Sequence, residues 1–227
     1  MFTSKDSAER RLAVEQTAIA LKVAREVGAR AVVLHLGKVP LQDPTPRLKT
    51  LYDQGKKGAE EARSYLEEMI ARRSALSGPA LEAAVSCLVE INNLAFELGI
   101  LVGIENRYGF AEVPNFKEFS AIFQEFSPGT AIGYWHDTGH AEANRNLGYG
   151  DPAEFLKSYG RRLIGMHLHD VVGGYRDHAS PGRGTVDWGL IKRYLNPSVI
   201  KVLEFAPGMD VKEAREGISF LKRIGIK

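Results

Sequence analysis

Apolar stretches alternate with amphipathic segments along this chain of 227 residues. Residues 6–27 carry apolar side chains at helical spacing on one broad stripe, and Gly28 follows as a stop signal. Residues 30–37 then form a short run rich in Val and Leu, which predicts a buried strand ending at His35. The first unit of the pattern is therefore a helix followed by a strand.

The same pattern, a helical segment followed by an apolar run, repeats four times further along the chain. Each helical segment leads into an apolar run: 79–98 into ILVGIENR, 115–127 into TAIGYWHDTGH, 151–160 into RLIGMHLHD, and 187–195 into VIKVLEFAPG, before a last helix at 211–223. This alternation indicates parallel strands covered by helices, and continuous apolar runs are typical of strands buried on both faces. The pattern predicts one α/β domain, residues 1–227, built from parallel βα repeats.

An additional amphipathic helix is expected between the first and second strands. Within residues 48–73, apolar side chains recur at spacings of three and four, with charged residues on the opposite face. The SGPA segment at 77–80 predicts a break before the helix at 79–98. The apolar face is expected to lie against the rest of the domain or against a partner.

Composition narrows the class of protein. Hydrophobic residues make up 44% and charged residues 26%, which is ordinary globular usage, and the net charge of +2 favours neither nucleic acid nor an anionic membrane. A lone cysteine, Cys87, excludes a disulfide framework and a cysteine-based zinc ribbon. The start, MFTSKDSAERR, lacks the apolar core of a signal peptide, and no apolar run approaches the roughly 18 residues of a membrane span. We expect a soluble, cytoplasmic protein.

Every predicted strand ends in a residue type that binds metals or moves protons. In chain order these are His35, Glu105, Asp137 with His140, His167 with His169, and Glu204. Charged groups are rarely buried singly, and the carboxyl ends of parallel strands open on one face, where active sites lie. The five strand ends therefore predict a shared polar site.

Each of these residues also has an ordinary structural interpretation. Glu105 could pair with Arg107, and Asp137 could cap the following helix. Glu204 could be an ion-pair partner only, and His35 could be satisfied by backbone groups.

His167 and His169 alternate on one strand and so point to the same face, but only one needs to be a ligand. The other could be a core or hydrogen-bonding histidine. Carboxylate oxygens with one imidazole suit Mg, Mn, Co or Zn.

Five motifs carry a resemblance to a known family: IEN at 104–106, DTGH at 137–140, MHLHD at 166–170, SPGRG at 180–184 and LEF at 203–205. With them the chain resembles the xylose-isomerase-like TIM barrel superfamily, which contains sugar isomerases and epimerases and the endonuclease IV type of DNA repair enzyme. The resemblance implies a TIM-barrel-type fold of eight strands. Only strands four to eight are visible here, so the barrel is expected to be N-terminally truncated.

The resemblance also implies a metal site. Ketose 3-epimerases of this superfamily hold one divalent metal through Glu, Asp, His and Glu, which match Glu105, Asp137, His167 and Glu204. That cofactor is expected to be Mn, Mg, Co or Zn. Glu105 and Glu204 would act as the two acid/base catalysts on a metal-chelated enediolate.

Four further residues are expected to bind substrate. His140 matches the family's substrate-contacting histidine, and His178 falls where epimerases often carry a substrate-binding arginine. His35 closes the first strand beside them in the predicted site. Arg183 replaces the usual glutamate of a Pro-Gly-Glu-Gly turn, so the extra cation would suit an anionic sugar, although a solvated loop arginine is the alternative.

The leading functional hypothesis is isomerisation or epimerisation of a sugar or sugar phosphate. An endonuclease IV-like zinc phosphoesterase is one alternative, favoured by the many histidines and the Glu-Asn pair at 105–106. Arg176 in place of an expected aspartate and the lack of a basic stripe count against it, so nucleic acid is not expected as a partner. A non-catalytic truncated barrel is the other alternative. Bare sheet edges favour self-association into a homo-oligomer.

Overall fold

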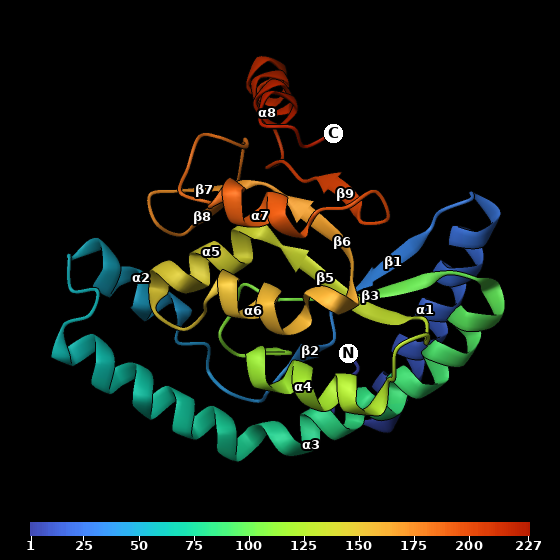
Figure 1. The fold of residues 1–227 in the computed structure, drawn as a ribbon. Coiled ribbons are helices and arrows are strands. Elements are labelled where there is room, and N and C mark those ends of the chain that lie inside the picture. Colours follow the sequence, from blue (N-terminus) through green and yellow to red (C-terminus); the bar gives the residue numbers. More distant parts are fainter. The chain divides into compact units, whose positions relative to one another are not determined.

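The computed structural model describes residues 1–227. Its helices are α1 Ser7–Glu26, α2 Thr45–Asp53, α3 Glu60–Leu98, α4 Phe116–Glu125, α5 Thr138–Leu147, α6 Pro152–Tyr159, η1 Gly160–Arg162, α7 Trp188–Tyr194 and α8 Val211–Arg223. Its strands are β1 Ala31–Leu34, β2 Gly37–Lys38, β3 Leu101–Glu105, β4 Glu112–Val113, β5 Ile132–Asp137, β6 Leu163–Leu168, β7 Asp170–Val172, β8 Arg176–Ala179 and β9 Ile200–Leu203. Strands and helices alternate as the sequence predicts (Figure 1).

One five-stranded sheet has the order β1-β3-β5-β6-β9. The pairs β1/β3 and β6/β9 are parallel, with Ala31 opposite Leu101 and Gly165 opposite Ile200. The sequence prediction of an α/β fold with five parallel strands is confirmed, and β1 and β9 are the edges of the sheet. Two short antiparallel pairs, β2/β4 and β7/β8, were not predicted.

The chain divides into two compact units. Unit 1 comprises residues 1–44 and 63–134, and unit 2 comprises residues 45–62 and 135–227. Each unit is described by itself below.

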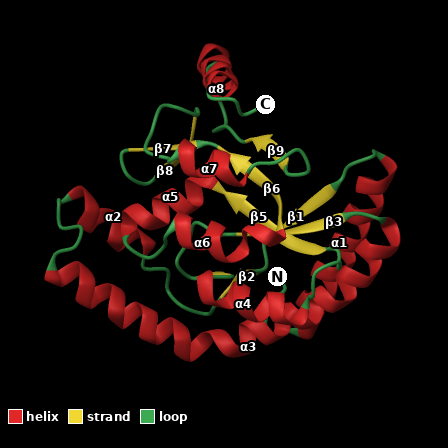
Figure 2. Cartoon of the chain, viewed as in Figure 1, coloured by secondary structure: helices red, strands yellow, loops and turns green.

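The core of unit 1 consists of buried apolar side chains from α1, α3, α4, β1 and β3. Figure 2 shows these helices in red and these strands in yellow. Its fully buried members include Leu21, Leu88, Ile104, Phe119 and Tyr134. Asp6 caps α1 by accepting a hydrogen bond from the amide of Ala8, which confirms the helix predicted at 6–27.

The helix predicted at 48–73 and the break predicted at 77–80 are both wrong. Residues 54–59 separate α2 from α3 instead, because Gly55 and Gly58 take positive φ values of 70° and 76° after α2 ends. α3 then continues through Pro79. Proline costs one backbone hydrogen bond, but Arg73 and Ala80 are buried on either side of it, so burial of a continuous face outweighs that loss.

α3 also contains a stretch that is long and apolar enough, by length and composition alone, to cross a membrane. The sequence-based statement that no run approaches a membrane span is therefore wrong for this helix. A single such helix is weak evidence for a membrane, because core helices of folded proteins pass the same test. Ala84, Leu88 and Ile91 of α3 belong to the core of unit 1.

α1 and its C-cap residue, Val27, expose an apolar stripe in unit 1. Leu12, Ile19, Val23 and Val27 are between 49% and 73% exposed, and they recur at spacings of four and seven. An exposed stripe of this kind can serve as a contact surface. Self-association stays a prediction.

The core of unit 2 lies between β6 and the helices α5, α6 and α7. Its buried members include Trp135, Leu156, Met166, Leu168 and Ile191. The ring of Trp135 occupies the space where a Cβ on Gly165 would stand, so only glycine fits at that position of β6.

Asp170 organises the loops of unit 2. Its fully buried carboxylate accepts hydrogen bonds from the amides of Gly182 and Val186 and from the indole of Trp188. One aspartate therefore fixes the β7–β8 hairpin, the SPGRG turn and the start of α7 together.

Candidate metal centre

Asp137 is the last residue of β5 and the N-cap of α5. Its Oδ1 accepts a hydrogen bond of 2.7 Å from the amide of His140, so the capping role that the sequence left open is real. The side chain is completely buried. Because capping occupies only part of the carboxylate's acceptor capacity, Asp137 can still bind another group.

Two further candidate ligands of unit 2 lie beside Asp137. His167, on β6, places Nδ1 3.6 Å from Asp137 Oδ2 and 3.2 Å from Glu204 Oε2. Glu204 directly follows β9 and its side chain is 39% exposed. The three candidate donor atoms lie within 4.8 Å of one another, so the ends of β5, β6 and β9 bring these predicted residues together.

Electrostatics keeps Asp137 ionised. Burial alone would raise the pKa of Asp137, but the surrounding imidazoles of His140, His169 and His167 hold that pKa well below its usual range. A buried carboxylate that remains charged is ready to bind a cation.

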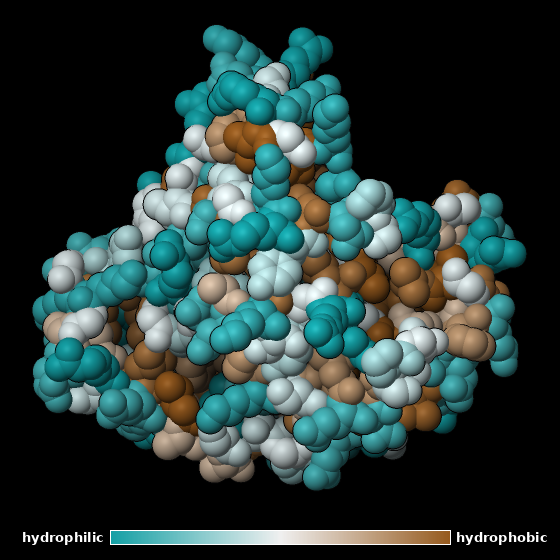
Figure 3. All heavy atoms as spheres, in the orientation of Figure 1, coloured by the Kyte–Doolittle hydropathy of each residue, from teal (hydrophilic) through white to brown (hydrophobic).

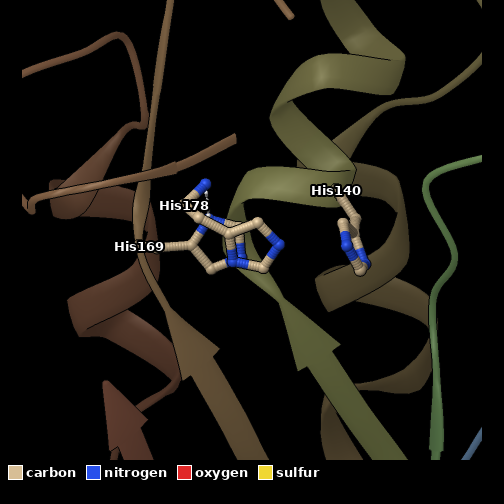
Figure 4. Close-up of side chains that lie close together, drawn as sticks. All are labelled: His140, His169 and His178. Atoms are coloured by element: carbon tan, nitrogen blue, oxygen red, sulfur yellow. Dashed lines mark hydrogen bonds between the residues drawn. The ribbon is translucent and has the colours of Figure 1, made fainter. Parts of the chain in front are cut away.

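A histidine cluster adjoins this carboxylate (Figure 4). His169 Nε2 lies 2.9 Å from Asp137 Oδ1, and the rings of His169 and His178 stack with centroids 4.4 Å apart. His140 Nε2 lies 3.7 Å from Asp177 Oδ2.

In unit 1, Glu105 ends β3 and is 1% exposed. His35 Nε2 lies 3.0 Å from Glu105 Oε2, and Arg107 also donates a hydrogen bond to that oxygen. Arg107 is held in turn by Glu112, at 3.1 Å from Nε and 3.0 Å from Nη2 to the same Oε1. The ion pair with Arg107 that the sequence offered as the alternative for Glu105 is therefore present.

Arg183 lies on the surface of unit 2. It pairs with Glu216 of α8 and is 54% exposed. It lines a groove of about 720 Å³ along α8 together with Lys212, Arg215 and Phe220. The α8 region in Figure 3 is mostly hydrophilic, with one small apolar patch. The substrate-binding role predicted for Arg183 stays a prediction.

Sequence reasoning missed four residues that shape this centre. Asp170 supports the β7–β8 hairpin, and Asp177 lies beside His140. Thr138 Oγ1 donates a hydrogen bond to the carbonyl of His169 over 2.7 Å. Gly139 is required because a Cβ there would lie 2.1 Å from the His169 ring. For Thr138 and Gly139 the available signal was the motif DTGH, in which these two small residues follow the capping aspartate.

The donor set of unit 2 fits a divalent cation. It combines an ionised buried carboxylate, an imidazole and a second carboxylate at adjacent strand ends. Oxygen donors with one nitrogen suit Mg, Mn, Co or Zn rather than a soft metal.

A model of the xylose isomerase-like TIM barrel family matches residues 1–224. An uncharacterized protein of Methanocaldococcus jannaschii, MJ1311, is 27% identical over 189 residues, which cover 79% of this chain and 50% of that protein. The uncharacterized protein y4fM of Sinorhizobium fredii is 27% identical over 212 residues, covering 92% of this chain and 57% of that protein. The chain thus spans about half the length of the curated relatives it matches, and its five strands form a partial TIM barrel.

Solved structures show the same fold. A D-tagatose 3-epimerase-like protein is 23% identical with a TM-score of 0.66, covering 98% of this chain and 72% of its own. An L-ribulose 3-epimerase is 14% identical, with a TM-score of 0.63 and coverage of 98% and 72%. The IOLI protein, whose structure contains a zinc atom, is 17% identical, with a TM-score of 0.63 and coverage of 98% and 71%.

Proposed function

Because the chain belongs to the xylose isomerase-like TIM barrel family, we propose that it acts as a divalent-metal-dependent isomerase or epimerase of a sugar or sugar phosphate. The observation that carries this proposal is the convergence of Asp137, His167 and Glu204 at three strand ends. Several similar structures carry the names of sugar epimerases or of an epimerase-like protein, and these names support isomerisation or epimerisation as the reaction class.

We propose Glu105, Asp137, His167 and Glu204 as the ligands of one Mn, Mg, Co or Zn ion. Glu105 is included because it ends β3, which neighbours β5 in the order of the sheet. Asp137 ends β5, His167 lies one residue before the end of β6, and Glu204 directly follows β9. When bound, the metal would polarise the carbonyl and adjacent hydroxyl of the sugar as a Lewis acid.

Two carboxylates would move the proton. Glu105 and Glu204 are the two glutamates of the set, so one would remove the proton from the carbon next to the carbonyl and the other would return it. In unit 1, His35 and Arg107 hold Oε2 of Glu105. In unit 2, Glu204 is more accessible, with His178 Nδ1 3.9 Å from its Oε1.

Imidazoles and a cation would orient the substrate. His140 and His178 present ring nitrogens beside Asp177 and would bind hydroxyl groups, and His35 would do so at Glu105. Arg183 would favour a substrate that carries a phosphate or carboxylate, provided that the substrate replaces its partner Glu216.

A second candidate is phosphoester cleavage by several zinc ions. It is favoured by the second group of potential ligands, His140, His169 and His178. However, His169 already uses one ring nitrogen on Asp137 and the other on the amide of His178, so it has no ring nitrogen left for a metal ion. The number of metal ions per chain distinguishes the two candidates.

The test is exchange of the carbon-bound proton of a ketose with deuterium. The protein, loaded with Mn²⁺, would be incubated in D₂O with a panel of ketoses and ketose phosphates, and incorporation followed by NMR. Wild type and Glu68→Gln, a surface control on α3, are expected to exchange, and Glu204→Gln is expected to lose at least about 100-fold in rate. Lack of exchange on every sugar, from a folded and metal-loaded protein, would contradict the proposal and favour a non-catalytic barrel.

A further inference from the structure

Hydrogen bonds hold both ring nitrogens and the backbone amide of His169, although this residue is not a proposed metal ligand. Its side chain is completely buried. Nε2 lies 2.9 and 3.0 Å from the two carboxylate oxygens of Asp137, and Nδ1 accepts a 2.8 Å hydrogen bond from the backbone amide of His178. Its own amide donates to Thr138 Oγ1 over 3.1 Å, and Gly139 leaves room for the ring.

The bond from His178 decides which ring nitrogen of His169 carries the proton. A backbone amide only donates, so Nδ1 must accept and has no proton. In the neutral ring the proton is then on Nε2, which donates it to Asp137. The amide of His178 therefore makes His169 a hydrogen-bond donor to the carboxylate.

His178 reaches this position at a conformational cost. It is the one non-glycine residue with a positive φ, 56°, and it lies on β8 of the β7–β8 hairpin. Residues other than glycine rarely adopt this conformation, and it persists where surrounding contacts hold it. Here those contacts are the amide bond to His169 and the stacking of the two rings, with an interplanar angle of 17°.

We propose that His169 is a positioning residue that orients Asp137 for metal binding and connects the β7–β8 hairpin to that ligand. The inference rests on the metal site of the proposed function. His169 and the amide of His140 hold the Asp137 carboxylate from two directions, so the carboxylate has one orientation before the cation arrives. Partners of this kind commonly change metal affinity 10- to 100-fold.

The test is Mn²⁺ and Zn²⁺ affinity, measured by titration calorimetry on metal-free protein, with urea unfolding of each variant alongside. His169→Phe fills the same space without a donor and is expected to weaken binding about 10- to 100-fold. His169→Gln keeps an N–H that can reach Asp137 and a carbonyl oxygen that can accept from the amide of His178, and is expected to stay within about 5-fold of wild type. Thr17→Val, which removes the side-chain hydrogen bond of buried Thr17 in α1 to the carbonyl of Ala13, is the control and should bind metal as wild type does.

The outcomes separate the inference from the proposed function. Equal affinity for wild type and His169→Phe would overturn the positioning role while leaving the metal site intact. Equal weakening in His169→Phe, His169→Gln and Thr17→Val would assign the effect to general stability and also overturn it. Failure of wild type itself to bind either metal would overturn the proposed function, and the positioning role with it.

Discussion

Arg73 of α3 offers a sharp test of how unit 1 is held together. Its guanidinium is buried, with Nη1 2.6 Å and Nη2 2.9 Å from the two carboxylate oxygens of Glu118. It also donates to the backbone carbonyls of Phe110 and Glu112, over 2.9 and 2.7 Å. Arg73 thereby fixes the segment whose Glu112 side chain holds Arg107, the partner of Glu105.

Replacing Arg73 with Met keeps much of the apolar stem but leaves the Glu118 carboxylate buried with a single backbone donor, the amide of Asn115. Breaking a buried ion pair from one side costs about 3–5 kcal/mol. Two carbonyls that lose their donors add about 1 kcal/mol or more. We therefore expect a loss of about 4–6 kcal/mol, a large share of the roughly 5–15 kcal/mol by which domains are stable.

Urea unfolding followed by circular dichroism measures this loss. The double variant Arg73→Met/Glu118→Gln removes the stranded charge, so it is expected to recover about 1–3 kcal/mol relative to Arg73→Met. Arg72→Met is the control, because Arg72 is 61% exposed and pairs only with Glu68 in the same helix; it should cost less than about 0.5 kcal/mol. A cost below about 1 kcal/mol for Arg73→Met would refute the reasoning.

Other predictions concern packing and the lone thiol. Gly165→Ala would place a Cβ 2.1 Å from the Trp135 ring, so it should cost about 1–3 kcal/mol in urea unfolding and change tryptophan fluorescence. Burial raises the pKa of the Cys87 thiol, so labelling by a thiol reagent at pH 8 should be slow in the native protein and fast in urea. Equally fast labelling in both states would contradict the buried position of Cys87.

The sequence was informative about the strands because burial on both faces leaves a strong apolar signal. Glu105 and Asp137 end their strands, and Glu204 directly follows its strand, as predicted. The positions of these polar residues followed from the same pattern, since each interrupts an apolar run at its end.

Tertiary contacts account for what the sequence could not predict. Pro79 normally indicates a helix end, but the buried face of α3 continues past it, and only the packed core reveals that face. The donor role of His169 depends on the amide of His178, nine residues away on a hairpin that the sequence analysis did not predict. Local propensity carries no information about either contact.

Metal content per chain, measured by elemental analysis of the purified protein, tests the central claim most directly. The comparison is between wild type, Glu204→Ala and the surface control Glu216→Ala. The account predicts about one divalent ion per chain in wild type and in the control, and loss of most of it in Glu204→Ala. About three zinc ions per chain would indicate the phosphoesterase instead. Absence of metal in wild type, or full retention in Glu204→Ala, would contradict the proposed site.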